Sequence, residues 1–172
     1  MWLSKKVLLL ILVGALAGCG FRPLYGTSGT TGSGGPVVDE FSAIKIERVA
    51  NRTGQQLHNH LLDLLTPRGQ PATPAYLLRV TLRESKREIA VRSTGLATRA
   101  NIRVNAKFAL VDMATGDLLT NGTARAFSSY NLTDSEFSNL TAEKDTLSQA
   151  TRIIAADIRA RLGAYFTGKD PA

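Results

Sequence analysis

Two neighbouring segments of this chain alternate between apolar and polar residues, and this pattern narrows the possible folds more than any other. Every second residue is apolar from Tyr76 to Leu82 and again from Ala100 to Leu110, with Ser93-Thr94-Gly95 between the segments. A period of two places alternate side chains on opposite faces of a strand, so the pattern predicts two half-buried antiparallel strands joined as a hairpin. Other parts of the chain must cover the apolar face of this hairpin.

Two segments before the hairpin have patterns of their own. Phe41–Val49 alternates around Ile44 and Ile46 and predicts a first strand. Downstream, leucines recur at helical spacing and predict a helix with one apolar side, formed by Leu57, Leu61, Leu64 and Leu65. Thr53 and Gln56 have the spacing of a capping box at the start of that helix.

After the hairpin, the sequence predicts one more strand and one long helix. A turn at 112–117 leads to a strand over about 118–130, in which Asn121-Gly122 predicts a bulge or kink. The helix is expected to begin between Asp134 and Thr141. Its apolar stripe consists of Leu140, Leu147, Ala150, Ile154, Ile158, Leu162 and Phe166. The predicted fold is therefore an α+β two-layer sandwich of order β-α-β-β-β-α, in which two helices cover one face of a mainly antiparallel four-stranded sheet.

The first 18 residues have the layout of an export signal. Lys5 and Lys6 precede an apolar run from Val7 to Leu16, which is too short for a comfortable transmembrane helix. Leu16-Ala17-Gly18 then precedes Cys19, the single cysteine of the chain, as in bacterial lipoprotein signals. We therefore expect residues 1–18 to be removed and Cys19 to carry a covalent diacylglycerol and an N-acyl chain, with no other cofactor. An ordinary secretory signal followed by an incidental cysteine is the alternative.

The mature chain is expected to consist of a tether and one domain. Residues 26–36 contain five glycines and no apolar side chain, so residues 19–36 are predicted to be a lipidated flexible tether. Residues 37–172 are long enough for a single domain with its own core. Loss of Lys5 and Lys6 with the signal lowers the formal net charge from +7 to +5, which suits an anionic partner or simply solubility.

The sequence contains no recognisable catalytic or metal-binding pattern. His58 and His60 are two residues apart on a predicted helix, so their side chains diverge and do not share a metal ion. A P-loop, a nucleophile elbow and a dinucleotide-binding glycine pattern are all missing from the sequence. We therefore predict that the protein is not an enzyme; an exported hydrolase with an unrecognised site is the alternative.

Basic residues concentrate on the polar side of the predicted hairpin. Each strand carries three of them at every fourth position: Arg79, Arg83 and Arg87 on the first, and Arg99, Arg103 and Lys107 on the second. Arg125 on the next strand extends this stripe if its side chain points the same way. Arginine binds phosphate through two parallel hydrogen bonds, so the stripe predicts an anionic ligand; the alternative is the solvated face of a sheet. Nucleic acid is excluded as a partner by the expected export.

The segment Cys19-Gly20-Phe21-Arg22-Pro23-Leu24-Tyr25-Gly26 resembles the start of the mature lipoproteins of the LptE family in alphaproteobacteria. The predicted order of strands and helices is also similar to that family's fold. The resemblance implies a lipoprotein on the periplasmic side of the outer membrane that fills the lumen of the LptD β-barrel. It also implies lipopolysaccharide as a ligand, which the two proteins together place in the outer leaflet.

No ligand residue of the family maps onto this sequence individually. The candidate lipopolysaccharide-binding residues Arg79, Arg83, Arg99, Arg103 and Lys107 therefore follow from the stripe alone. An accessory lipoprotein of outer-membrane β-barrel assembly, with no lipid ligand, is the alternative function.

Overall fold

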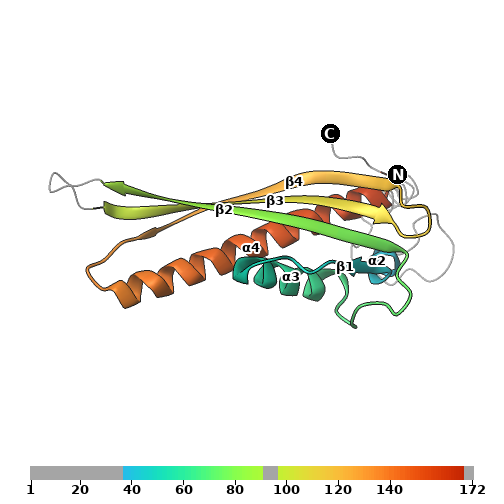
Figure 1. Ribbon diagram of the computed structural model, residues 1–172, viewed down its shortest axis with the longest axis horizontal. Coiled ribbons are helices and arrows are strands. Elements are labelled where there is room, and N and C mark those ends of the chain that lie inside the picture. Colours follow the sequence, from blue (N-terminus) through green and yellow to red (C-terminus); the bar gives the residue numbers. More distant parts are fainter. Residues whose placement is uncertain (1–36, 91–96, 169–172) are drawn as a thin grey trace, which may run out of the picture. The chain divides into compact units, whose positions relative to one another are not determined.

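In the computed structural model, the described residues, 37–90 and 97–168, form a four-stranded sheet with the long helices beneath it (Figure 1). The elements in chain order are α2 (Val37–Ser42), β1 (Ile44–Ile46), α3 (Arg52–Leu65), β2 (Tyr76–Ala90), β3 (Ala97–Asp112), β4 (Leu118–Asn131) and α4 (Glu136–Phe166). The expected signal, Cys19 and the tether lie outside the described residues.

The strands lie in the sheet in the order β1-β2-β3-β4. β2 pairs antiparallel with β3 and β3 with β4, whereas the short β1 pairs parallel with β2. The parallel pair follows from the helical connection, because α3 carries the chain back to the end of the sheet at which β1 began. The predicted α+β sandwich, with its mainly antiparallel sheet, is confirmed.

The predicted first strand over Phe41–Val49 is too long at both ends. Residues 37–42 form the short helix α2, and only Ile44–Ile46 pair with β2. Phe41 is 5% exposed and its ring meets the ring of Phe166 edge to face, with 6.0 Å between the centroids. Phe41 therefore joins the core from a helix, and the alternation that indicated a strand extends only over Ile44 and Ile46.

The predicted capping box at the start of α3 is also wrong. The N-cap residue is Asn51, which has a φ of 72° and makes no side-chain capping hydrogen bond. Thr53 and Gly54 are instead buried in the first turn. A Cβ atom on Gly54 would lie 2.7 Å from Cγ1 of Val49, so the glycine allows the first turn of α3 to pack closely against the preceding segment.

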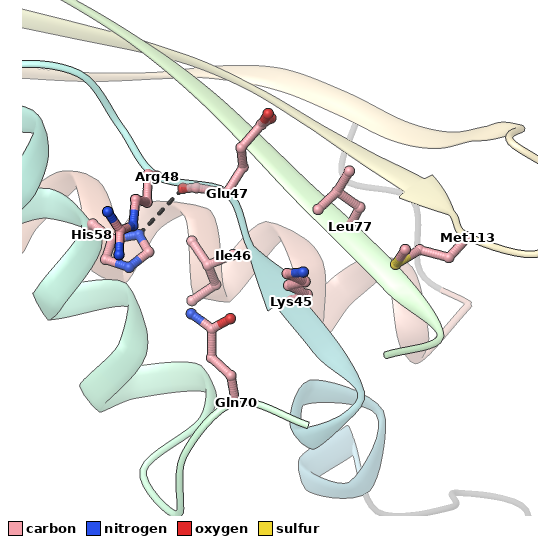
Figure 2. A pocket seen from close by; sticks show the side chains of 8 residues that line it. All are labelled: Lys45, Ile46, Glu47, Arg48, His58, Gln70, Leu77 and Met113. Carbon is pink, nitrogen blue, oxygen red and sulfur yellow. Dashed lines mark hydrogen bonds between the residues drawn. The ribbon is translucent and has the colours of Figure 1, made fainter. Parts of the chain in front are cut away.

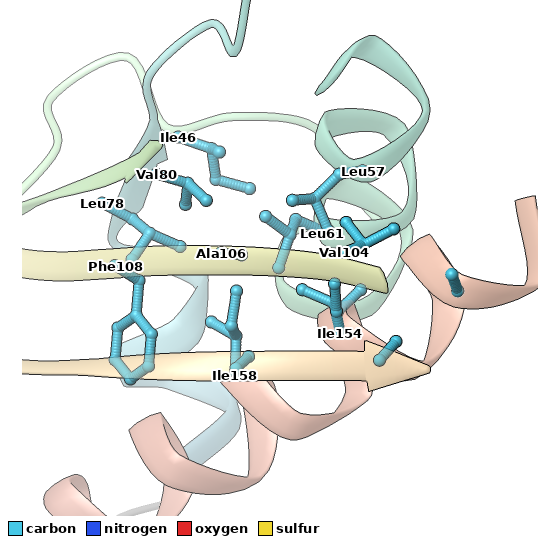
Figure 3. Packing of buried hydrophobic residues seen from close by; sticks show 14 of the residues in the cluster. Ile46, Leu57, Leu61, Leu78, Val80, Val104, Ala106, Phe108, Ile154 and Ile158 are labelled. Atoms are coloured by element: carbon cyan, nitrogen blue, oxygen red, sulfur yellow. The ribbon is translucent and has the colours of Figure 1, made fainter. Parts of the chain in front are cut away.

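The core lies between the sheet and the two long helices (Figure 3). Leu57 and Leu61 of α3 and Ile154 and Ile158 of α4 are fully buried. From the sheet, Leu78, Val104 and Ala106 are fully buried as well, and Val80 and Phe108 nearly so. The apolar side of the predicted hairpin and the predicted helix stripes therefore cover one another.

The long helix α4 begins within the predicted range, at Glu136, and the Ser135 hydroxyl accepts a hydrogen bond of 3.3 Å from the Ser138 N–H. Most of its predicted stripe is buried, but Leu140 is 50% exposed. In this part of the helix the polar Asn139 and Glu143 are less exposed than Leu140. The predicted apolar stripe therefore extends one to two turns further toward the N-terminus of α4 than the apolar contact between α4 and the sheet.

Gly122 permits close packing rather than a bulge. The irregularity in the pairing of β3 with β4 falls between Leu110 and Val111, beyond Gly122. Gly122 is paired with Phe108, and a Cβ atom on it would lie 2.9 Å from two atoms of the Phe108 ring. The glycine thus leaves room for a nearly buried aromatic side chain.

Candidate functional site

One face of the sheet carries the helices, and the opposite face carries most of its cations. Leu78 and Val80 of β2 and Val104 of β3 are even-numbered and buried on the helix side, so the odd-numbered side chains point to the opposite face. The cations of the predicted stripe are all odd-numbered and exposed. Arg125 of β4 pairs with Asn105 of β3 and so lies on the same face. The basic face consists of Arg79, Arg83, Arg87, Arg99, Arg103, Lys107 and Arg125.

The strand register places the cations of β2 and β3 out of phase. Arg83 pairs with Asn105, Arg87 with Asn101, and Arg79 with Ala109. In return, Lys107 pairs with Thr81, Arg103 with Ser85, and Arg99 with Ile89. No cation of one strand is therefore directly opposite a cation of the other, which avoids the most unfavourable arrangement of like charges. The six residues form a zigzag in which diagonal neighbours lie about 7–8 Å apart.

Four of the cations surround Asn105. Arg83 and Arg125 flank it on the two neighbouring strands, and Arg103 and Lys107 lie two residues away from it along β3. Asn105 itself is half-buried, whereas the four cations are exposed. The asparagine amide can both donate and accept hydrogen bonds. The centre of the basic face is therefore a polar side chain within a ring of positive charge.

Little negative charge opposes these cations. β2, β3 and β4 place no acidic residue at the odd-numbered positions of the basic face. Arg79 Nε lies 3.6 Å from Glu47 Oε2, and both side chains are more than half exposed. Over the described ranges 37–90 and 97–168, no other cation of the basic face forms an ion pair. The face can therefore accept several anionic groups without first breaking internal ion pairs.

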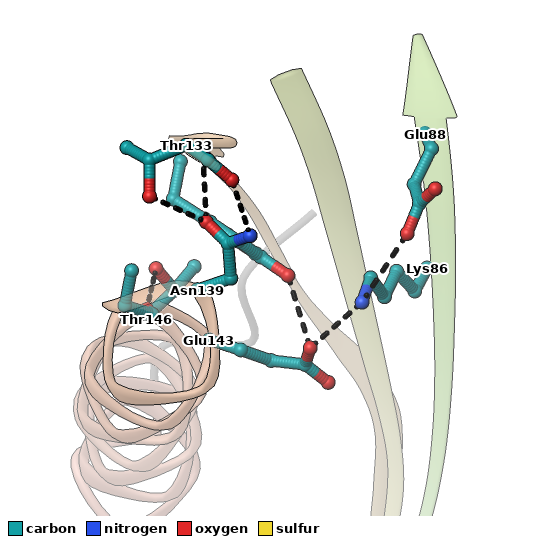
Figure 4. A network of polar contacts seen from close by, with 8 residues as sticks. Lys86, Glu88, Thr133, Asn139, Glu143 and Thr146 are labelled. Carbon is teal, nitrogen blue, oxygen red and sulfur yellow. Dashed lines mark hydrogen bonds and ion pairs between the residues drawn. The ribbon is translucent and has the colours of Figure 1, made fainter. Parts of the chain in front are cut away.

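A polar cluster on the helix side of the sheet was missed by the sequence reasoning (Figure 4). Lys86 of β2 donates a 2.8 Å hydrogen bond to Glu143 of α4, and the Tyr130 hydroxyl of β4 donates one of 2.9 Å to the same carboxylate oxygen. The sequence does contain a signal, because the alternation that ends at Leu82 continues with the charged residues Glu84, Lys86 and Glu88 at the same parity. These charges are the signal that this half of the strand contacts polar partners.

The contact with Lys86 shifts the protonation of the cluster. It lowers the pKa of Glu143, and the same hydrogen bond raises the pKa of Lys86 above its usual value. Burial raises the pKa of the Tyr130 hydroxyl. The pair is therefore charged at neutral pH, and it connects the N-terminal part of α4 to the sheet.

An open pocket of about 610 Å³ lies beside β1 (Figure 2). Lys45, Arg48, His58 and Gln70 line it together with apolar residues, and His58 Nδ1 lies 3.2 Å from the Glu47 carbonyl oxygen. Among the described residues that line it, none is a hydroxyl or thiol nucleophile. His60 is outside the lining, and burial lowers its pKa. Over the part of the chain that the structure describes, no group of three or more potential metal ligands occurs.

Comparison with known families connects this geometry to a biological process. A sequence profile of the LptE family, described as lipopolysaccharide-assembly, matches residues 41–162. The chain belongs to the LptE family. The match covers β1 through most of α4, so both the basic face and the Lys86–Glu143 cluster lie inside the LptE region. No curated protein sequence matches the chain.

Solved structures share the LptE fold seen here. A candidate lipoprotein from Caulobacter crescentus is 23% identical, with a TM-score of 0.64 over 77% of this chain and 97% of that one. A minor lipoprotein from Acinetobacter baumannii is also 23% identical, with a TM-score of 0.53 over 70% and 90%. An uncharacterised lipoprotein B from Nitrosomonas europaea is 13% identical, with a TM-score of 0.56 over 83% and 95%. At these identities the similarity establishes the fold alone.

The structure places all five candidate lipopolysaccharide-binding residues of the stripe, Arg79, Arg83, Arg99, Arg103 and Lys107, on one face. Arg87, which the predicted stripe also included, lies on this face, and so does Arg125, its conditional extension. Among the described residues, no helix is both long and apolar enough to cross a membrane. Lipid attachment at Cys19 stays a prediction, because that residue lies outside the described ranges.

Proposed function

We propose that this LptE-family chain is a lipoprotein of the outer membrane that fills the LptD barrel and helps to insert lipopolysaccharide into the outer leaflet. The family match supports a role in lipopolysaccharide assembly. The basic face is the observation that carries the finer proposal, because it offers seven cations and no acidic residue on one side of β2–β4. We assign the chain no catalytic step.

The basic face suits a ligand with several phosphate groups. Guanidinium groups bind phosphate through two parallel hydrogen bonds, and six of the seven cations are arginines. The zigzag spacing of about 7–8 Å allows neighbouring cations to contact separate phosphates of one large ligand. Contacts of this kind would replace the divalent cations that bridge neighbouring lipopolysaccharide molecules, and so loosen their packing.

The other parts of the chain would hold the domain in place. The lumen of an outer-membrane barrel is lined with polar side chains, so the domain is expected to dock there through polar faces and loops. Acyl chains on Cys19 would anchor it to the periplasmic side of the membrane, since several chains together give stable anchoring. The glycine-rich part of the tether, the eleven residues 26–36, has a root-mean-square reach of a little under about 20 Å, which keeps the domain close to the bilayer.

Charge reversal on the basic face tests the lipid contact. We expect the Arg99→Glu and Arg103→Glu double variant to bind lipopolysaccharide about tenfold more weakly or worse, because it replaces two attractions with two repulsions. Lipopolysaccharide delivery to the cell surface should fall in parallel. The matched control is the Arg68→Glu and Arg152→Glu variant, which makes the same charge change at exposed positions outside the face. Unchanged binding by a folded Arg99/Arg103 variant would show that the face is merely solvated.

Co-purification from detergent-solubilised membranes tests the partner. Retention of LptD at near-equal stoichiometry is the expected result. Recovery of several β-barrel assembly lipoproteins instead would favour the alternative function, an accessory role in barrel assembly without a lipid ligand.

A further inference from the structure

A large aromatic side chain lies on the basic face, on the edge strand β4. Phe127 of β4 is 61% exposed, and its odd-numbered position places it on the same side of the sheet as Arg125. It pairs directly with Arg103 of β3 and lies two residues from Arg125 along its own strand. Two arginines and one exposed phenylalanine therefore occupy adjacent positions of the sheet.

Phe127 is the one aromatic side chain of the basic face in the described parts of β2–β4. A phenyl ring left in water forgoes the favourable burial of its apolar surface. Its arginine neighbours do not cover it, since more than half of the residue is exposed. A ligand that covers the ring and also neutralises the arginines would satisfy both requirements at once.

We propose that Phe127, Arg103 and Arg125 form a bipartite site for an amphipathic anion, a phosphorylated lipid whose phosphate binds the two guanidinium groups and whose hydrocarbon covers the ring. The inference rests on the proposed function and adds a specificity to it, namely recognition of the lipid part of the ligand. The direct pairing of Phe127 with Arg103 keeps their Cβ atoms about 4.5–5.5 Å apart. This separation is short enough for one lipid to contact the arginine with its phosphate and the ring with its nearest methylene groups.

Soluble phosphate compounds carry the same anionic groups as a phosphorylated lipid but lack its hydrocarbon. Comparing the two kinds of ligand therefore distinguishes the contribution of the arginines from that of the ring. Binding of two probes to the full-length, detergent-solubilised protein is measured by calorimetry. One probe is purified lipid A and the other is soluble inorganic tripolyphosphate. We expect Phe127→Ser to bind lipid A about tenfold more weakly, because it loses an apolar contact, and to bind tripolyphosphate as the unaltered protein does.

Three further variants make the result interpretable. Phe137→Ser is the matched control, since Phe137 is 79% exposed at the start of α4 and lies outside the basic face; it should change neither affinity. Phe127→Leu keeps an apolar side chain and should restore most of the lipid A affinity. The Arg103→Gln and Arg125→Gln variant should weaken the binding of both probes.

The possible failures are distinct. Unchanged lipid A binding by Phe127→Ser would overturn the role of the ring while leaving the proposed function intact. An equal loss for tripolyphosphate would also overturn it, because a lipid-specific contact cannot affect a probe without hydrocarbon. Failure of the unaltered protein to bind either probe would contradict the proposed function itself.

Discussion

Two residues show how single side chains shape the sheet from its two sides. On the helix side, Gly122 lacks the Cβ atom that would lie 2.9 Å from the Phe108 ring. On the opposite side, Asn105 is a neutral residue between four cations on neighbouring positions of the sheet. Gly122 is small where its neighbour is large, and Asn105 is neutral where its neighbours are charged.

At Gly122, we predict that alanine destabilises the fold by about 1–2 kcal/mol, because the added methyl group overpacks a nearly buried aromatic ring. The gain from a stiffer unfolded chain, about 0.4–1 kcal/mol, is smaller than this cost. Urea denaturation measures the free energy of unfolding. Phe108→Leu serves as the partner in a double-mutant cycle, since a shorter side chain should relieve the clash. Additive effects of the two substitutions would argue against a direct clash.

At the scale of the element, β2 changes character half-way along its length. Its helix-facing residues are apolar from Leu78 to Leu82 and charged from Glu84 to Glu88. The charged half meets the N-terminal part of α4 through Lys86 and Glu143. There the turn before α4 is held by hydrogen bonds of 2.8 Å from the Thr133 N–H to Asn139 and from the Asn139 side chain to the Thr133 carbonyl (Figure 4).

The Lys86–Glu143 pair predicts a specific dependence of stability on pH. The pKa of Glu143 is lowered in the folded state, so its contribution is present above its unfolded pKa and is lost as the pH falls through the folded value. The pKa of Lys86 is raised, so its own contribution is lost only at strongly alkaline pH. We expect Glu143→Gln to lose about 0.5–1 kcal/mol at pH 7, since both side chains are partly exposed.

Urea denaturation at pH 7 and at acid pH, below the usual carboxylate range, measures this effect. The difference between the unaltered protein and Glu143→Gln should shrink at the acid pH. Glu84→Gln is the matched control, because Glu84 is exposed on the same side of β2 and forms no ion pair within the described residues. A difference that stays constant with pH would contradict the titration argument.

Local sequence patterns were sufficient to predict which face of a strand each side chain occupies. They were not sufficient to predict which distant residues the side chains contact. Alternation correctly separated Leu78 from Arg79, because burial on one face leaves a period of two in the sequence. It did not predict the contact of Lys86 with Glu143, which are 57 residues apart. It also mistook the helical Phe41 for a strand residue, because α2 has only six residues and is too short for a helical period.

At the scale of the whole molecule, the described domain and the N-terminal segment have separate tasks. The domain carries the basic face and the core, and the family match lies within it. The N-terminal segment carries the predicted lipoprotein signal and Cys19. Binding and anchoring are therefore expected to be separable by substitution.

Replacement of Cys19 by serine tests this separation. We predict that Cys19→Ser removes fatty-acid labelling of the protein, because the chain has no second thiol, and shifts it from the membrane fraction to the soluble fraction. Metabolic labelling with palmitate and cell fractionation provide the measurement. Ser28→Ala, in the predicted tether, should leave both unchanged. Palmitate labelling that persists in the Cys19 variant would refute the predicted attachment.

The out-of-phase cations also bear on how the hairpin folds. A slip of two residues between β2 and β3 would keep every side chain on its proper face, so burial alone discriminates weakly against it. In one direction, however, such a slip would place Arg79 opposite Lys107, Arg83 opposite Arg103 and Arg87 opposite Arg99. Repulsion in all three pairs would penalise that misfolded hairpin. The same spacing of cations that allows the face to bind an anion thus also disfavours a hairpin with the wrong strand register.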